Sequence, residues 1–324
     1  MDDVGALMAA HDPAPAELRP DELLLAEILA TARPRRPVPR WRMGVGAVLA
    51  TGLVIVAANA VPSQESDGAL TVAATLDYAG SAVALCGEPG PRPSRLPGPG
   101  GSARPGLLAL AGRAVATPLP ATGSNLITVV QSRLLTDDGG SRMRTSLVRL
   151  RTPVSGQGVR QRTEFPMNGQ GGLLVQGQGR AEATPYQSGL VAGRLPTRAG
   201  ALRTRLLGAG QARGRPETAR LVGAVVELNE NEVVGGRVAG AIWRLLAGRA
   251  DLRALGRVTD RRGRAGQGFA FDAGESERWV LVADAATGAL LSVERVVLAD
   301  TGGLEVTPPC VRDFWVFVAR EWRP

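Results

Sequence analysis

The residue types that most enzymes use for catalysis are nearly absent from this chain of 324 residues. All 38 basic residues are arginine, so there is no amine for a Schiff base, a P-loop or a kinase-type site. His11 is the only histidine, and Cys86 and Cys310 are the only cysteines. Ser-His-Asp sites, Cys-His sites and zinc cages of His and Cys therefore cannot form in the main body of the chain.

Carboxylates are the remaining candidates for acid–base chemistry. Glu227, Glu230 and Glu232 crowd one short stretch, and Asp260 and Asp284 follow later in the chain. A carboxylate-dependent hydrolase needs two such groups roughly 5 to 10 Å apart in a cleft. A solvated helix end is the simpler interpretation of the three glutamates. The hydrolase is one alternative function.

Cofactor and metal motifs are also missing. The 42 glycines form no G-x-G-x-x-G, G-x-S-x-G or Walker sequence, so we interpret them first as turn and linker residues. Residues 137–140 (Asp-Asp-Gly-Gly) lack the ligand spacing of an EF-hand loop and are typical of a hairpin turn. The sequence predicts no cofactor, no metal and no catalytic residue.

Cys86 and Cys310 form an even pair that suits a disulfide in an oxidising compartment. Such a bond would join the start of the exported region to its last strand. In the chain-entropy model, a loop of that length stabilises the fold by roughly 5 kcal/mol. Two free, buried thiols are the alternative.

Aromatic residues concentrate near the end of the chain, and they allow two interpretations. They either fill the core or line a groove for an apolar ligand. The candidate groove residues are Trp243, Trp279, Phe314, Trp315 and Phe317.

Residues 43–61 contain no charge over nineteen positions, close to the roughly 20 residues that span a bilayer. Five arginines and no acid lie within the ten residues before this segment, so the positive-inside rule keeps the preceding residues in the cytoplasm. A cleaved signal peptide and a buried soluble helix are the alternatives. The flanking arginines are Arg33, Arg35, Arg36, Arg40 and Arg42.

The cytoplasmic tail, residues 1–42, contains one candidate partner surface. Leu24, Leu25, Ile28 and Leu29 recur at helical spacing after an acidic start, which suits a short amphipathic helix. This apolar face could bind a cytoplasmic regulator such as a sigma factor. Alternatively, the helix is only marginally stable by itself and has no partner.

The exported region is strongly basic. Six Arg and seven acids lie in the tail, which leaves 32 Arg against 23 acids beyond it. Outside the membrane, nucleic acid is not an expected partner. Anionic lipid headgroups or envelope polymers are the anionic partners close to an exported domain. Solvated arginine faces are the simpler explanation.

The chain then divides into a Pro/Gly-rich extended linker over residues 62–106 and an α+β domain over residues 107–324. A mainly antiparallel sheet with segregated helices is expected. Helices are predicted over 107–115, 196–207, 216–232 and 236–246. Strands are predicted over 125–135, 142–150, 159–165, 173–175, 257–260, 267–271, 279–283, 290–298 and 314–319.

Several segments resemble an uncharacterised actinobacterial family of single-pass membrane proteins. They are residues 195–197 (Leu-Pro-Thr) with Leu202, Leu206 and Leu207, residues 241–247, residues 256–266 and residues 284–291, besides the Arg-Pro-Arg-Arg that ends at Arg36. Trp243 replaces a usual Tyr, and Gly248-Arg249 replaces a Pro-Gly pair.

Members of that family have no established activity and are often encoded beside extracytoplasmic-function sigma factors, so the resemblance implies a signalling role by association. Because catalytic motifs are missing from the sequence, we expect the exported domain to be non-enzymatic. The element pattern also resembles the LolA and RseB half-barrel, which holds lipid or peptide. We therefore expect a single-pass membrane protein engaged in envelope sensing or anti-sigma regulation, with a lipid carrier as an alternative.

Overall fold

The computed structural model describes residues 72–73, 75–78, 81–93, 96, 98, 100–114, 122–137, 140–168, 174–175, 178–209, 214–299 and 306–323. The chain divides into two compact units, Met1–Ser63 and Gln64–Pro324, and every described residue belongs to the second. The predicted membrane segment 43–61 and the tail face of Leu24, Leu25, Ile28 and Leu29 lie outside the described residues. Within the described ranges, no helix has the length and apolarity to cross a bilayer.

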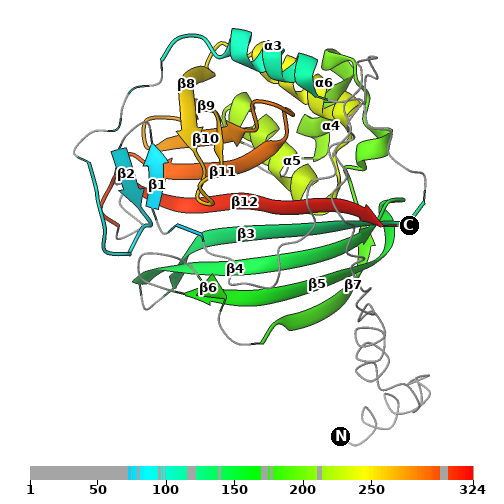
Figure 1. Ribbon diagram of the computed structural model, residues 1–324, viewed down its shortest axis with the longest axis horizontal. Coiled ribbons are helices and arrows are strands. Elements are labelled where there is room, and N and C mark those ends of the chain that lie inside the picture. The colour runs from blue at the N-terminus through cyan, green and yellow to red at the C-terminus, as the bar shows by residue number, and fades with distance from the viewer. Residues whose placement is uncertain are drawn as a thin grey trace, which may run out of the picture. The chain divides into compact units, whose positions relative to one another are not determined.

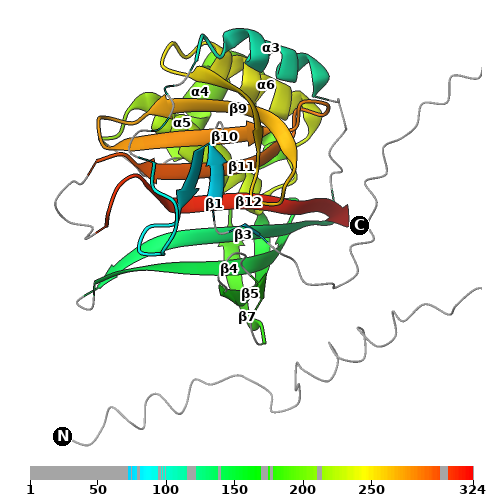
Figure 2. The same ribbon diagram turned by 60° about the vertical axis from the view of Figure 1, so that its left-hand side comes forward.

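The second unit is an α+β domain, as expected from the sequence. The α-helices of the described residues lie together on one side of the sheet, and β3, β4, β5 and β7 extend away from them (Figures 1 and 2). The helices are α3 (Arg104–Arg113), α4 (Ala199–Ala209), α5 (Glu217–Asn231) and α6 (Gly236–Ala247), with a short 3-10 turn η2 (Ala192–Arg194). The strands are β1 (Thr75–Tyr78), β2 (Ser81–Ala84), β3 (Ser124–Asp137), β4 (Gly140–Pro153), β5 (Gln157–Asn168), β6 (Leu174–Val175), β7 (Arg180–Gln187), β8 (Arg253–Thr259), β9 (Ala265–Asp272), β10 (Glu277–Ala283), β11 (Leu290–Val297) and β12 (Cys310–Arg323).

All strands join one antiparallel sheet in the order β2-β1-β8-β9-β10-β11-β12-β3-β4-β5-β6, with β7 also paired to β5. The sheet curls back on itself at one end. Leu85, directly after β2, forms a parallel bridge with Val311 of β12, and the N–H of Cys86 donates to the Val311 carbonyl at 2.9 Å. Strands from β2 to β12 therefore enclose an interior.

Alternation along the strands fills two cores, one on each face of the sheet. Trp315 and Phe317 of β12 point into the first core, which the helices cover, whereas Phe314 and Val316 point into the second. Val83 and Leu85 close the second core from the β2 side. The helix α5 contributes its apolar face at i, i+3 and i+4 spacing to the first core.

The long hairpin of β3 and β4 follows the predicted one and extends it by a few residues at each end. Its fourteen paired positions run from Ser124 opposite Pro153 to Asp137 opposite Gly140. Each strand has adjacent apolar residues near its centre, Val129 and Val130 in β3 and Leu147 and Val148 in β4, and all four are buried. Adjacent residues point to opposite faces, so the sheet buries both faces here.

Residues 62–106 were predicted to form an extended linker, and this prediction is wrong for the described residues from 72 onward. Residues 75–78 and 81–84 are strands, Leu85 and Leu96 are buried, and α3 begins at Arg104. Prolines and glycines did not prevent folding because the segment turns back on itself, with the Ala84 N–H donating to the Pro91 carbonyl at 3.0 Å. The folded domain therefore starts before residue 107.

Candidate functional site

Cys86 and Cys310 are joined by a disulfide, so the alternative of two free thiols does not hold in this structure. Both cysteines are fully buried, in a small apolar cluster with Leu134, Val297 and Val306. The bond lies beside the bridge between Leu85 and Val311, and it closes the curled end of the sheet covalently.

The five aromatic residues of the predicted groove are core residues. Each is at most 8 % exposed, and Phe314 faces the second core while the other four belong to the first. The groove prediction is therefore wrong, because strand alternation sends neighbouring residues of β12 to opposite faces. The five residues are Trp243, Trp279, Phe314, Trp315 and Phe317.

Asp260 and Asp284 organise turns. The Oδ1 of Asp260 accepts from the backbone N–H groups of Arg262 and Arg264, both at 2.9 Å, and its Oδ2 pairs with the Arg264 side chain. The Oδ1 of Asp284 accepts from the N–H groups of Ala286 at 2.7 Å and of Thr287 at 2.9 Å. Neither aspartate joins the glutamates of α5.

Glu230, near the end of α5, is held against β3 and β12. Its Oε1 accepts from the Trp315 indole N–H at 2.9 Å, and Arg133 lies 3.9 Å away. With its amide nitrogen facing the helix, Gln131 donates to the same oxygen at 3.0 Å and accepts from Arg162 at 3.1 Å. Burial raises the pKa of Glu230 to about 7, despite the nearby arginine.

Glu232, one residue beyond α5, is only 2 % exposed. Its Oε2 accepts from the Asn125 amide at 3.0 Å, and its Oε1 has no partner within the described part of the chain. Burial raises the pKa of Glu232 to about 7. The prediction that all three glutamates lie on a solvated helix end is therefore correct for Glu227, which is exposed, and wrong for Glu230 and Glu232.

A polar tether, defined as Asn125, Thr152, Asn231, Glu232 and Val233, fixes the end of α5 to the sheet. Asn125 accepts from the Val233 N–H at 3.2 Å, and the Thr152 hydroxyl donates to the Asn231 carbonyl at 2.5 Å. The two carboxyls with a near-neutral pKa are therefore occupied in holding α5. Glu232 is too enclosed to present its carboxyl to a substrate.

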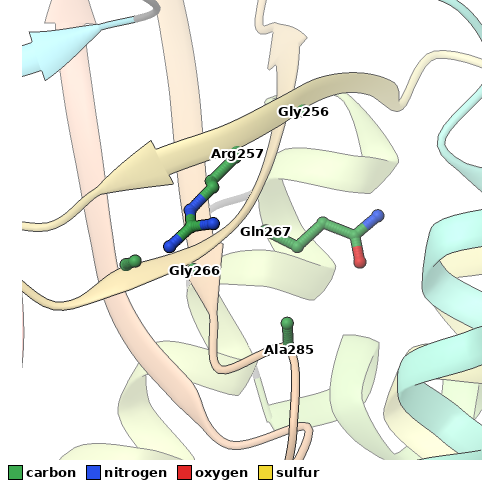
Figure 3. Close-up of a pocket in the computed structure, with 6 residues that line it drawn as sticks. Gly256, Arg257, Gly266, Gln267 and Ala285 are labelled. Carbon is green, nitrogen blue, oxygen red and sulfur yellow. The ribbon is translucent and has the colours of Figure 1, made fainter.

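An open pocket lies instead beside the paired strands β8 and β9 (Figure 3). It has a volume of about 460 Å³, within the range of small-molecule sites. Figure 3 shows the Arg257 and Gln267 side chains leaving the neighbouring strands β8 and β9. Ala285 lies on the turn between β10 and β11. The lining residues are Gly256, Arg257, Ala265, Gly266, Gln267 and Ala285.

The pocket is built by strand register and by two glycines. Arg257 lies directly opposite Gln267 in the β8 and β9 pairing, so both side chains leave the same face. Gly256 has a φ of +78°, which favours glycine, and it follows a register shift in β8. A Cβ on Gly266 would lie 2.6 Å from the Ala283 carbonyl oxygen, so only glycine lets β9 approach β10 this closely.

Sequence reasoning did not identify this pocket. Arg257 and Gln267 are ten residues apart and carry no motif, and only the pairing register brings them together. The available signal was the run from Gly256 to Gly266, which contains three glycines around a tight turn.

No family model matches the chain, and a search of curated proteins finds no matching relative.

Proposed function

We propose that this chain is a single-pass membrane protein whose exported α+β domain has a binding role, and that it reports an envelope condition to a partner of its cytoplasmic tail. Residues 43–61 would form the membrane anchor. The domain of the second unit would lie outside the plasma membrane, and Leu24, Leu25, Ile28 and Leu29 would contact the partner.

The observation that carries this proposal is the bond between Cys86 and Cys310. Structural disulfides form and persist in oxidising compartments and are rare in the cytosol. The bond therefore supports the same topology as the arginine-flanked apolar segment, from an independent property of the chain.

A binding role is favoured over catalysis by where the acidic groups lie. Asp260 and Asp284 are engaged in turns, and Glu232 is enclosed in the polar tether. The open pocket at β8 and β9 has no carboxylate in its lining. It therefore offers a place for a ligand without the paired acids that a hydrolase requires.

The lipid carrier receives less support. The half-barrel resemblance would need an apolar cavity against the sheet, and the aromatic side chains expected to line it are packed in the cores. The described pocket is lined by glycine, alanine, arginine and glutamine. We therefore propose a sensor rather than a carrier.

A reporter fused after Pro324 tests the topology. We expect alkaline phosphatase to be active and a cytosol-dependent reporter to be inactive. A full-length chain in the soluble fraction, or a reporter active only in the cytosol, would overturn the proposal.

Capture of a sigma factor tests the regulatory role. We expect the full-length chain to retain the sigma factor and a Leu25→Asp/Ile28→Asp variant to lose it, because two charges interrupt the apolar face. An Asp12→Asn variant, outside that face, is the matched control. Equal capture by all three proteins, or capture by none together with unchanged transcription on deletion, would contradict this role.

A further inference from the structure

The pocket at β8 and β9 carries positive charge that nothing in the described residues neutralises. Arg257 is exposed, and its guanidinium has neither an ion pair nor a hydrogen bond with any described residue. The acids of the two neighbouring turns are engaged elsewhere. Asp260 pairs with Arg264, and Asp284 accepts two backbone N–H groups.

A second donor leaves the neighbouring strand β9. Gln267 is half-buried, and its side-chain amide likewise has no hydrogen-bond partner among the described residues. Its amide nitrogen lies against Gly106 of α3, where an added Cβ would approach it to 2.2 Å. The helix therefore limits where the amide can go, and it keeps this donor at the edge of the pocket.

The wall of the pocket at Ala285 is also fixed. Arg113 of α3 donates to the Ala285 carbonyl at 2.6 Å, so helix and turn are held together. The cation and the neutral donor thus lie between elements that α3 holds in position, which limits the conformational cost of binding.

We infer that this pocket binds a small molecule through a carboxylate or phosphate group, with Arg257 as the charged donor and Gln267 as the neutral one. This inference rests on the binding role proposed above and names its ligand class. A guanidinium presents paired N–H donors that match both anions, and such bonds are stronger than neutral ones. Only Ala265 and Ala285 offer apolar side chains, so an acyl chain would find little to contact.

Calorimetric titration of the purified full-length protein tests the inference, with inorganic phosphate, citrate and neutral inositol as probes. We expect phosphate or citrate to bind saturably with a millimolar or lower Kd and inositol not to bind. Arg257→Gln should weaken anion binding at least tenfold. Gln267→Leu should weaken it less, because it removes a neutral donor.

Arg198→Gln is the matched control, since Arg198 is an exposed arginine ahead of α4 and is not among the residues that line the pocket. It removes the same charge and should leave the affinity unchanged. Equal affinity of wild type and Arg257→Gln, equal loss in Arg198→Gln, or no binding of either anion at 10 mM would overturn the inference. The titration is independent of membrane topology, so its failure is distinguishable from a failure of the proposed export.

Discussion

At the scale of single residues, the carboxyls of Glu230, near the end of α5, and of Glu232, just beyond it, determine how stability depends on pH. Glu230 and Glu232 have a pKa of about 7 in the folded chain, against an ordinary value of 4.5, because burial disfavours their charged forms. The folded state therefore holds these protons more tightly than the unfolded state. The stability that results is fully present below pH 4.5 and is lost as the pH rises to about 7.

We therefore predict that the free energy of unfolding falls between pH 5 and pH 7.5, by roughly 1.4 kcal/mol for each unit of pKa difference in one group. Urea unfolding across this range measures it. Glu232→Gln, a permanently neutral mimic of the acid, should flatten the profile, whereas Glu275→Gln in an exposed turn should not. A stability that rises over this range would contradict the prediction.

At the scale of elements, the polar tether orients α5 on the sheet. Asn125→Ala removes the donor to Glu232 and the acceptor for the Val233 N–H, and it leaves buried polar groups unpaired. A loss of about 1 to 3 kcal/mol in the free energy of unfolding is expected. Gln157→Ala at the exposed start of β5 is the control, and equal effects of the two substitutions would show that the tether does not hold the helix.

A buried ion pair joins the turn after β8 to β11. Arg261 donates to both Glu294 oxygens, at 3.1 and 2.9 Å, and both side chains are fully buried. Glu294→Gln leaves the guanidinium without its counter-charge, so denaturant unfolding should reveal a loss of about 3 to 5 kcal/mol. Arg144→Gln, which breaks an exposed pair with Glu164, should have a much smaller effect.

Elements with a strong local pattern were predictable from the sequence. The β3 and β4 hairpin follows from two strand-like segments on either side of an Asp/Gly-rich turn, and α3 follows from Pro105 in its first turn. Strands β1 and β2 were missed because they border a Pro/Gly-rich stretch, and β7 because its charges and Pro185 give no apolar alternation. The pairing of Arg257 with Gln267 depends on register, which no local pattern encodes.

At the scale of the whole molecule, the disulfide links the segment after the edge strand β2 to the start of the central strand β12, 224 residues away in the sequence. Restricting so long a loop in the unfolded chain stabilises the fold by roughly 5 kcal/mol in the entropy model. We predict that Cys86→Ser/Cys310→Ser lowers the free energy of unfolding by several kcal/mol. Unfolding with and without reductant measures this, and a double variant as stable as the oxidised wild type would contradict it.

We propose that the folded domain lies outside the cytoplasm, and the oxidation state of Cys86 and Cys310 in growing cells tests this location. Cells are quenched in acid, and the full-length chain is treated with a maleimide polymer before and after reduction. We expect no gel shift before reduction and a shift of two polymers after it. Two accessible thiols in the chain taken directly from cells would contradict it.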